Sequence, residues 1–219
     1  MLYYIDDNRI ELEELKKRIE TTDLIPSYTL LLDGIEEKFD AIKNYGILTL
    51  ADLRKELKNP KTMAILGTKT NIDIKYLTIL RREIEGYFPK PIPISAFDWL
   101  ENNKLNVLEN RGYKNTVMLY ESLTDSDIRY ELINTADLDE KFLDEILGLA
   151  EITRIQWVSA KVARLLSAAG YVSVKSIAEA DAETFYKDVE NTNKENKYYN
   201  GKIGFRDIKR LIKGAEYLS

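Results

Sequence analysis

The sequence contains no cysteine and no histidine among its 219 residues. The absence of cysteine excludes disulfides, thiolate nucleophiles and zinc sites with cysteine ligands. The absence of histidine excludes Ser-His-Asp triads, Cys-His dyads and HExxH zinc sites. Any acid–base chemistry would therefore depend on carboxylates or lysines.

Glycine and proline are also scarce, at 10 and 5 residues, and long apolar runs are missing. The longest runs hold only a few residues, as in YTLLL at 28–32, which is far too short to span a membrane. The first residues, MLYYIDDNRIEL, have neither the basic stretch nor the apolar stretch of a signal peptide. We therefore expect a cytoplasmic protein with no membrane partner.

The remaining composition is that of a folded helical protein. Hydrophobic residues make up 44% of the chain and charged residues 32%, and Leu, Ile, Glu and Lys dominate, which favours helix. No segment shows sustained apolar–polar alternation, although IPISAF at 92–97 could form a short extended piece. The predicted fold class is therefore all-α. The net charge of −5 also means that any surface for nucleic acid would have to be local.

A turn pattern built on glycine occurs three times. In each copy an apolar residue follows the glycine, and a residue that caps helices well stands three positions after it. The glycines are Gly46, Gly112 and Gly170, and the capping residues are Thr49, Asn115 and Ser173. Glycine just past a helix adopts positive φ readily, and the capping side chain accepts a hydrogen bond from the next helix. Each copy therefore predicts a helix end followed closely by a helix start.

Apolar positions around these glycines continue in register. An offset of 66 residues relates the first copy to the second, and an offset of 58 relates the second to the third and pairs Trp99 with Trp157. We therefore predict three divergent repeats behind an N-terminal helical cap. The predicted boundaries are 1–30 for the cap and 31–92, 93–151 and 152–219 for the repeats. FPKPIPI at 88–94 separates the first two repeats, because its prolines cannot lie inside a helix.

A helix is predicted within the cap, near residues 9–21. Its apolar stripe at i, i+3 and i+7 consists of Leu12, Leu15 and Ile19. The residues that can cap its N-terminus are Asp6, Asp7 and Asn8.

The stretch ITRIQWVSAKVARLLSAAGYVSV at 152–174 resembles a helix-hairpin-helix motif, whose usual form is h-x-G-h-G-x-x-x-A-x-x-L followed by G-h. The matching positions are Ile155, Val158, Ala163, Leu166 and Gly170. Trp157 and Ser159 stand where the two hairpin glycines normally stand, and Trp99 and Glu101 stand there in the second repeat. In DNA-binding members of that superfamily the hairpin offers backbone N–H groups to a phosphate. Glu101 opposes such binding, which leaves the third hairpin as its best candidate.

The first repeat, LLDGIEEKFDAIKNYGI at 31–47, keeps Gly34 and Ile35 of the same motif. The whole chain, including YLTILRREIEGYFPKP and GKIGFRDIKRLI, is similar to a prokaryotic domain-of-unknown-function family built from degenerate helix-hairpin-helix units. This resemblance implies an all-helical repeat fold. It implies no activity and no catalytic residues.

Basic residues gather in the third repeat and form the candidate nucleic-acid site. One group has no acid near it in the sequence, and the other follows the last predicted helix at i, i+3, i+4 and i+7. The candidates are Arg154, Lys161, Arg164 and Lys175 in the first group, Lys202 ahead of the last helix, and Arg206, Lys209, Arg210 and Lys213 on it. Together they could form a phosphate-binding surface. The alternative is that both groups are ordinary solvated helix faces.

Acidic and aromatic residues suggest further candidate sites, for a metal ion and for stacking on bases. The stretch 120–151 is strongly acidic, but it lacks the spacing of an EF-hand loop, and Asp137, Asp139 and Glu140 are explained as acids at a helix start. Trp99 and Trp157 could stack on bases, although packing in a core is favoured for both. Tyr198 and Tyr199 lie in a polar insertion, where we expect exposed side chains for aromatic contacts.

The sequence thus predicts a non-enzymatic helical binding module without a cofactor or a metal site. Its leading partner is nucleic acid, bound weakly through phosphates at the third repeat. A second hypothesis is a protein–protein scaffold whose degenerate hairpins no longer bind DNA. A third, ranked last, is an enzyme that uses carboxylates and Mg²⁺.

Overall fold

The computed structural model describes residues 2–136 and 138–218. This part of the chain forms thirteen α-helices and two 3₁₀ helices, so the prediction of an all-α protein is confirmed. The described residues form no strand, and their extended pairing is limited to two isolated bridges, Glu11 with Thr49 and Pro93 with Asn115.

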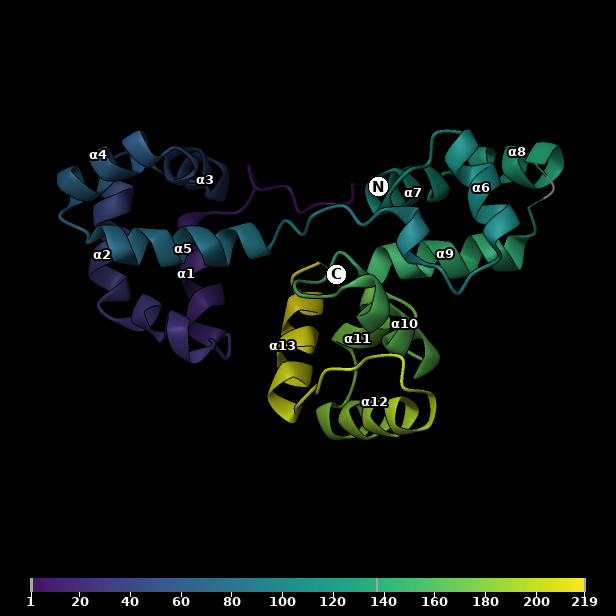
Figure 1. Ribbon diagram of the computed structural model, residues 1–219. Helices are drawn as coiled ribbons and strands as arrows, with labels where there is room; N and C mark the ends of the chain where they lie inside the picture. Colours follow the sequence, from purple (N-terminus) through teal and green to yellow (C-terminus); the bar gives the residue numbers. More distant parts are fainter. Residues whose placement is uncertain (1, 137, 219) are drawn as a thin grey trace. The chain divides into compact units, whose positions relative to one another are not determined.

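The chain divides into two compact units, both drawn in Figure 1. One unit consists of residues 5–88. The other consists of residues 89–219 together with residues 1–4. Each unit has its own core of buried apolar side chains. The division after Phe88 falls in the proline-rich stretch FPKPIPI, where helix cannot continue.

The unit of residues 5–88 is built around its last helix. Its elements are α1 (Leu12–Thr21), η1 (Pro26–Leu32), α2 (Ile35–Asn44), α3 (Leu50–Lys58), α4 (Pro60–Thr70) and α5 (Ile74–Gly86). α5 packs against α3, α4 and η1 (Figure 1). Leu53 and Leu57 on α3 and Leu77 and Leu80 on α5 are fully buried, as expected for apolar stripes at helical spacing.

α1 begins later than the sequence pattern indicates. Its N-cap is Glu11, which makes no capping hydrogen bond with its side chain. The chain before it is extended and pairs with the start of α3. Leu12 N–H donates to Leu48 O at 3.1 Å, and Leu50 N–H donates to Ile10 O at 2.8 Å. The predicted start near residue 9 with Asp6, Asp7 or Asn8 as the cap is therefore wrong, because pairing with residues 48–50 holds Glu11 extended.

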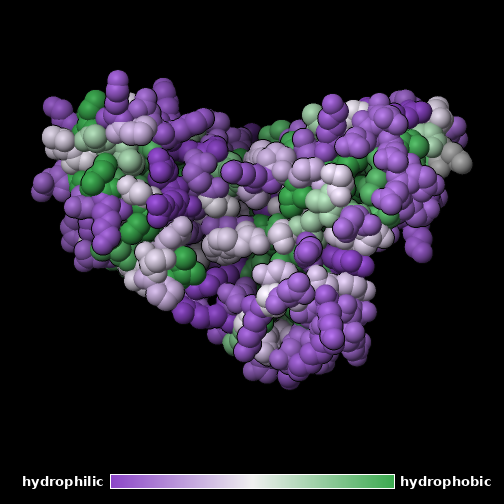
Figure 2. Space-filling model, viewed as in Figure 1, coloured by the Kyte–Doolittle hydropathy of each residue, from purple (hydrophilic) through white to green (hydrophobic). Residues whose placement is uncertain are grey.

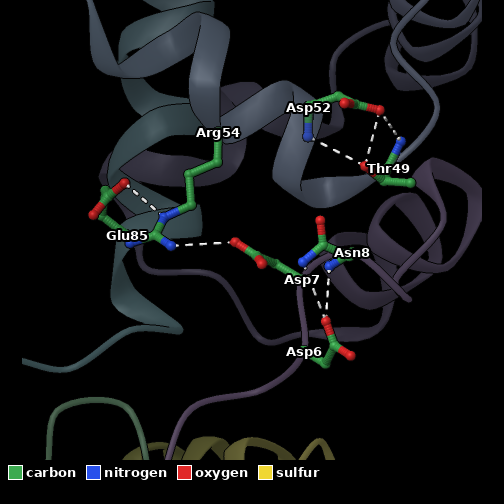
Figure 3. Close-up of polar contacts among 7 residues, drawn as sticks. All are labelled: Asp6, Asp7, Asn8, Thr49, Asp52, Arg54 and Glu85. Atoms are coloured by element: carbon green, nitrogen blue, oxygen red, sulfur yellow. Dashed lines mark hydrogen bonds and ion pairs between the residues drawn. The ribbon is translucent and has the colours of Figure 1, made fainter.

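Asp7 has a different role, in a network around Arg54 of α3 (Figure 3). Arg54 Nη1 donates to Asp7 Oδ2 at 3.2 Å, and Arg54 Nε donates to Glu85 Oε1 at 3.1 Å. The guanidinium carbon also lies 3.5 Å from the ring centroid of Phe88. Arg54 thus joins α3 to both ends of this unit, which lie far apart in the sequence.

The other unit contains the rest of the elements. They are η2 (Ile94–Ala96), α6 (Asn102–Asn110), α7 (Thr116–Leu123), α8 (Ser126–Ala136), α9 (Glu140–Ile152), α10 (Ala160–Ala168), α11 (Val174–Ala178), α12 (Ala182–Asn196) and α13 (Phe205–Glu216). α9 packs against α7, α8 and α10, and α13 packs against α11 and α12. Because α9 contacts helices on both sides of it in the sequence, α6–α13 share one core.

Gly46, Gly112 and Gly170 have the same local structure, with φ angles of +100°, +96° and +95°. Each glycine N–H donates to a carbonyl three residues back, and the next N–H donates to a carbonyl five residues back, which closes the preceding helix. The residues that cap the following helices through hydrogen bonds to backbone amides are Thr49, Asn115 and Ser173. The predicted helix ends and starts are therefore confirmed at these positions.

In the helix after each glycine, the first amide N–H also donates a hydrogen bond to a residue distant in the sequence. The pairing of residues 10–12 with α3 has a counterpart at Thr116, whose N–H donates to Ile92 O at 2.9 Å. After the third glycine, Val174 N–H donates instead to Glu151 Oε1 on α9 at 3.0 Å. A side chain of α9 therefore replaces the extended main chain at that position.

Candidate nucleic-acid interface

α9 and α10 are joined by a tight turn at residues 153–159. Ile155 N–H donates to Ile152 O, and Val158 N–H donates to Ile155 O. Trp157 has a φ of +69°, in the left-handed region that residues other than glycine rarely adopt. This residue occupies a glycine position of the helix-hairpin-helix pattern, and glycine is the residue that adopts positive φ most readily.

The two tryptophans differ in their surroundings. Trp99 is half-buried and meets Phe97 edge-on, with ring centroids 5.4 Å apart. Trp157 is 52% exposed, so the prediction that it packs in a core is wrong. The hairpin before α10 therefore carries an exposed indole, which the comparison of apolar positions alone did not indicate.

The N-terminus of α10 is electropositive. Ser159 is its N-cap and accepts a hydrogen bond from Val162 N–H at 3.3 Å. The first turn contains no acid, and Lys161 lies exposed in it. The first N–H groups of an α-helix have no acceptor within the helix, and the helix dipole adds partial positive charge at this end. Lys161 and these amides form a surface suited to an anion.

The corresponding starts of α2 and α6 carry carboxylates. Gly34, with a φ of +53°, is the N-cap of α2, and Glu36 and Glu37 follow in the first turn. Glu101 is the N-cap of α6, and its carboxylate binds Lys104 Nζ at 2.6 Å. These acids oppose phosphate at both positions.

Arg154 does not belong to an exposed surface, in contrast to the expectation from the sequence. It is only 8% exposed. Its Nε donates to Tyr3 O at 2.8 Å, and its Nη1 donates to Tyr120 Oη at 2.8 Å. The guanidinium is thus used inside the unit, and we leave Arg154 out of the candidate interface.

Arg164 of α10 lies between two aromatic rings. Its guanidinium carbon is 4.9 Å from the ring centroid of Trp99 and 4.3 Å from that of Tyr198. A cavity of about 160 Å³ beside them is also lined by Glu145 and Ser167. Stacking on aromatic faces holds a guanidinium in place while its N–H edge can still meet an acceptor. Arg164 is half-buried, so its contribution to an outer surface is smaller than that of Lys161.

The polar insertion is ordered by Asn193 of α12. Its Nδ2 donates to Tyr199 O at 2.9 Å, and Tyr199 N–H donates to its Oδ1 at 2.9 Å. The ring of Tyr199 lies so close to Gly201 that a Cβ there would be 2.5 Å from it. Tyr198 and Tyr199 are both half-buried against the core, so the expectation of exposed loop aromatics is wrong.

α13 carries its bases in two different settings. Arg206 and Lys209 are exposed, and the ammonium of Lys209 lies 4.8 Å from the ring centroid of Phe205. Figure 2 shows a mostly hydrophilic surface over the region of α12 and α13 on the visible face. Arg206 and Lys209 are therefore the most solvent-exposed bases of α13.

The other two bases of α13 form ion pairs on the same helix. Arg210 is nearly buried and lies 3.3 Å from Asp207 Oδ1. Lys213 lies 2.9 Å from Glu216 Oε2. Both pairs span i, i+3, and they reduce the positive charge available at these positions.

Lys175 and Lys202 lie on separate elements. Lys175 on α11 is highly exposed and lies 3.8 Å from Glu179 Oε1. Lys202 is exposed in the loop before α13 and lines a cavity of about 230 Å³ with Glu190 of α12. A hydrogen bond from Lys194, with a smaller effect from the charge of Lys202, lowers the pKa of Glu190.

The hairpin and α13 are neighbours in the fold. A Cβ added at Gly214 would lie 3.2 Å from Ile155 Cγ2, so the last turn of α13 packs directly against the hairpin. Lys161, Arg206 and Lys209 belong to one helical unit, in which Arg206 and Lys209 lie in the first half of α13, away from the Gly214 contact. The structure does not bring Arg154 to an exposed surface with them.

The acids of residues 120–151 serve as caps and ion-pair partners. Asp139 is the N-cap of α9 and accepts a hydrogen bond from Phe142 N–H at 2.9 Å. A hydrogen bond from Lys104, followed by that from the Phe142 amide, lowers the pKa of Asp139. Asp137, expected at the same helix start, lies outside the described residues. Within the described part of the chain, no group of three or more Asp, Glu, His or Cys side chains could hold a metal ion.

Residues 100–218 match a family model described as Domain of unknown function (DUF4332). The chain belongs to the DUF4332 family. The expected membership of a domain-of-unknown-function family is therefore confirmed. The resemblance predicted from the sequence extends over the whole chain. The DUF4332 match covers residues 100–218, which include α6–α13 and the hairpin before α10.

No curated protein and no solved structure matches this DUF4332 chain. Among the residues that the structure describes, every helix is too short or too polar to cross a bilayer.

Proposed function

We propose that this DUF4332 chain is a non-catalytic binding module that contacts nucleic-acid phosphates weakly. Its contact surface, which we name the hairpin surface, consists of Trp157, Ser159 and Lys161, extended along α13 by Arg206 and Lys209. The observation that carries the proposal is the start of α10. It has a serine cap and an exposed lysine where α2 and α6 have carboxylates.

The proposal includes three helix-hairpin-helix repeats of four helices each, α2–α5, α6–α9 and α10–α13. The common order of a hairpin, a helix, a positive-φ glycine and three further helices supports this division. The repeats correspond to residues 31–92, 93–151 and 152–219. We shorten the helical cap to residues 5–30, since residues 1–4 belong to the other unit.

Phosphate binding at the hairpin surface uses two kinds of donor. The amides of the first turn of α10 approach one phosphate oxygen, and the ammonium of Lys161 adds a full positive charge. The Ser159 side chain is larger than the glycine of the usual motif and holds the phosphate farther from the backbone. This geometry makes the binding weak and independent of sequence, while Trp157 can stack on an unpaired base.

Titration of fluorescein-labelled duplex and single-stranded DNA at about 50 mM and about 200 mM salt tests the proposal. We expect dissociation constants of about 10⁻⁴ to 10⁻⁶ M that rise steeply with salt. Lys161→Glu should weaken binding at least about tenfold at the lower salt, because it places a carboxylate at the phosphate position. The double substitution Arg206→Glu with Lys209→Glu should abolish measurable binding.

Lys187→Glu is the matched control, because Lys187 is an exposed lysine on α12 outside the hairpin surface. It changes the net charge by the same amount and should weaken binding less than Lys161→Glu. No binding at the lower salt, or equal losses for the two substitutions, would overturn the proposal.

A protein–protein scaffold is the second candidate, and the exposure of Trp157 favours it. Tryptophan is strongly enriched among residues that dominate protein interfaces. In this case a pull-down should retrieve one stoichiometric protein partner, and Trp157→Ala should abolish its capture. The DNA titration would then show no binding for any variant.

A further inference from the structure

Residues 2–4 belong to the same unit as residues 89–218, although residues 5–88 lie between them in the sequence. Tyr3 is 0% exposed and belongs to the core of that unit. This segment falls within the predicted helical cap, and no sequence pattern indicates a role for Tyr3. Its contacts are independent of the hairpin surface.

The main chain of Tyr3 is held at both of its polar groups. Its N–H donates to Glu121 Oε1 at 3.1 Å, and its carbonyl accepts from Arg154 Nε at 2.8 Å. Arg154 is fixed in turn by a hydrogen bond to Tyr120 Oη and by stacking 4.5 Å from the centroid of that ring. Side chains that bind the N–H and the C=O of one residue recognise a peptide backbone whatever its sequence.

The hydroxyl of Tyr3 lies in a chain of hydrogen bonds in which each hydroxyl donates to the next acceptor, from Thr116 through Tyr3 to Thr153. Thr153 Oγ1 donates its single proton to Ala150 O at 2.7 Å, so Tyr3 Oη is the donor in its 3.0 Å contact with Thr153. Tyr3 Oη accepts from Thr116 Oγ1 at 3.3 Å, and Thr116 Oγ1 accepts from Ile92 N–H at 3.1 Å. Each hydroxyl therefore donates once and accepts once. Phenylalanine would leave the buried Thr116 hydroxyl without its acceptor.

The side chains that bind Tyr3 belong to the part of the chain that matches the DUF4332 family, whereas Tyr3 itself lies outside that match. They lie on α7 and at the turn after α9, within the DUF4332 match of residues 100–218. Residues 2–4 lie outside that match. The recognising side chains thus come from the matched domain, and the recognised segment is supplied from elsewhere in the chain.

We propose that these residues form a binding site for a short tyrosine-containing peptide, and that residues 2–4 of the same chain are its resident occupant. The site, which we name the Tyr3 groove, consists of Thr116, Tyr120, Glu121, Thr153 and Arg154. It reads the peptide backbone through Glu121 and Arg154 and the tyrosine hydroxyl through the two threonines. A peptide in solution should therefore compete with the resident segment.

The test uses the full chain and the fluorescent peptide acetyl-Leu-Tyr-Tyr-Ile-amide, which has the sequence of residues 2–5. Tyr3→Ala removes the ring and hydroxyl of the resident segment and leaves only its main-chain contacts with Glu121 and Arg154, so this weakened occupant should let the variant bind the peptide at least about tenfold more tightly than the wild type. A peptide with phenylalanine in place of the first tyrosine should bind the variant about tenfold more weakly, because a buried hydroxyl partner is lost.

A triple variant provides the matched control. Adding Thr116→Val and Thr153→Val to Tyr3→Ala should remove the preference for tyrosine over phenylalanine. If Tyr3→Ala lowers the helical circular dichroism signal, addition of the tyrosine peptide should restore it. A helical Tyr3→Ala chain that does not bind the peptide, equal binding of both peptides to that variant, or lost helicity that the peptide fails to restore would overturn the proposal.

Discussion

The hairpins before α6 and α10 have the same backbone hydrogen bonds and opposite charge. Phe97 N–H donates to Ile94 O, and Leu100 N–H donates to Phe97 O, which is the arrangement at Ile155 and Val158 shifted by 58 residues. The side chains of the six residues that donate or accept these bonds, three in each hairpin, are buried and apolar. The shape of each hairpin is therefore set by its core contacts.

The charge of each hairpin is set by the residue at the N-cap position of the next helix. Glu101 occupies the N-cap position of α6 without a capping hydrogen bond from its side chain, whereas the side chain of Ser159 caps α10. Both lie in exposed positions, so a change of charge there does not disturb the core packing. The two hairpins thus share these hydrogen bonds but differ in the charge at the start of the next helix and in the backbone at the tryptophan, since only Trp157 has a positive φ.

The largest expected effect tests whether the two hairpins are equivalent in the core. Leu108 on α6 and Leu166 on α10 are both fully buried, so Leu108→Ala and Leu166→Ala should each lower the free energy of unfolding by about 2–5 kcal/mol. Urea denaturation followed by tryptophan fluorescence measures this, because both tryptophans of the chain lie in this unit. Val172→Ala, at an exposed position, is the control. A leucine substitution that costs no more than this control would break the comparison.

Glycines after the two hairpin helices should show the next largest effect. An added Cβ at Gly112 or Gly170 meets nothing within 4 Å, so only the positive φ opposes a side chain there. Gly112→Ala and Gly170→Ala should therefore each cost about 1–2 kcal/mol, measured by the same denaturation. Ser167→Ala, one turn earlier on α10, should change stability much less. Unequal costs at the two glycines would contradict their structural equivalence.

Exchanging the residue types at the N-cap positions of α6 and α10 separates the effect of charge on DNA binding from any effect on stability. Ser159→Asp should leave stability within about 0.5 kcal/mol, since Asp and Ser cap helices about equally well. The new carboxylate should nevertheless weaken DNA binding about tenfold at low salt. The reverse change, Glu101→Ser, should strengthen it, as measured in the same titration. Unchanged DNA binding in Ser159→Asp would show that the start of α10 is not the phosphate contact.

The smallest effect concerns pH. Asp139 has a lowered pKa in the folded chain, chiefly because Lys104 donates to it, so its charged form is favoured by folding. Its contribution is therefore present above the unfolded pKa of about 4 and is lost as the pH falls through the folded value. Asp139→Asn keeps a capping oxygen but lacks the charge. Its Tm should lie below that of the wild type at about pH 6, and the two should converge in acid.

A substitution of Ser159, the N-cap of α10, is the control for the pH dependence of Asp139→Asn. Ser159 has no titrating group, so Ser159→Ala should cost about 1 kcal/mol at both pH values. A Tm difference for Asp139→Asn that is as large in acid as at neutral pH would show that its charge is not the cause.

Local chemistry in the sequence was enough to predict the helical class and the turns at Gly46, Gly112 and Gly170. A positive φ, a capping side chain and an apolar stripe depend on residues within a few positions of one another, and their residue types reveal them. The start of α1 could not be predicted in this way. Its boundary depends on pairing with residues 48–50, which are distant in the sequence.

The sequence by itself determined where helices end and which faces of them are apolar, because these properties arise from neighbouring residues. Only the tertiary structure decided which charges and rings reach solvent. Arg154 and Lys161 belong to one basic stretch, yet Arg154 is buried against Tyr3 while Lys161 is exposed. That difference depends on a segment about 150 residues away in the chain, and so on long-range packing that no local pattern records.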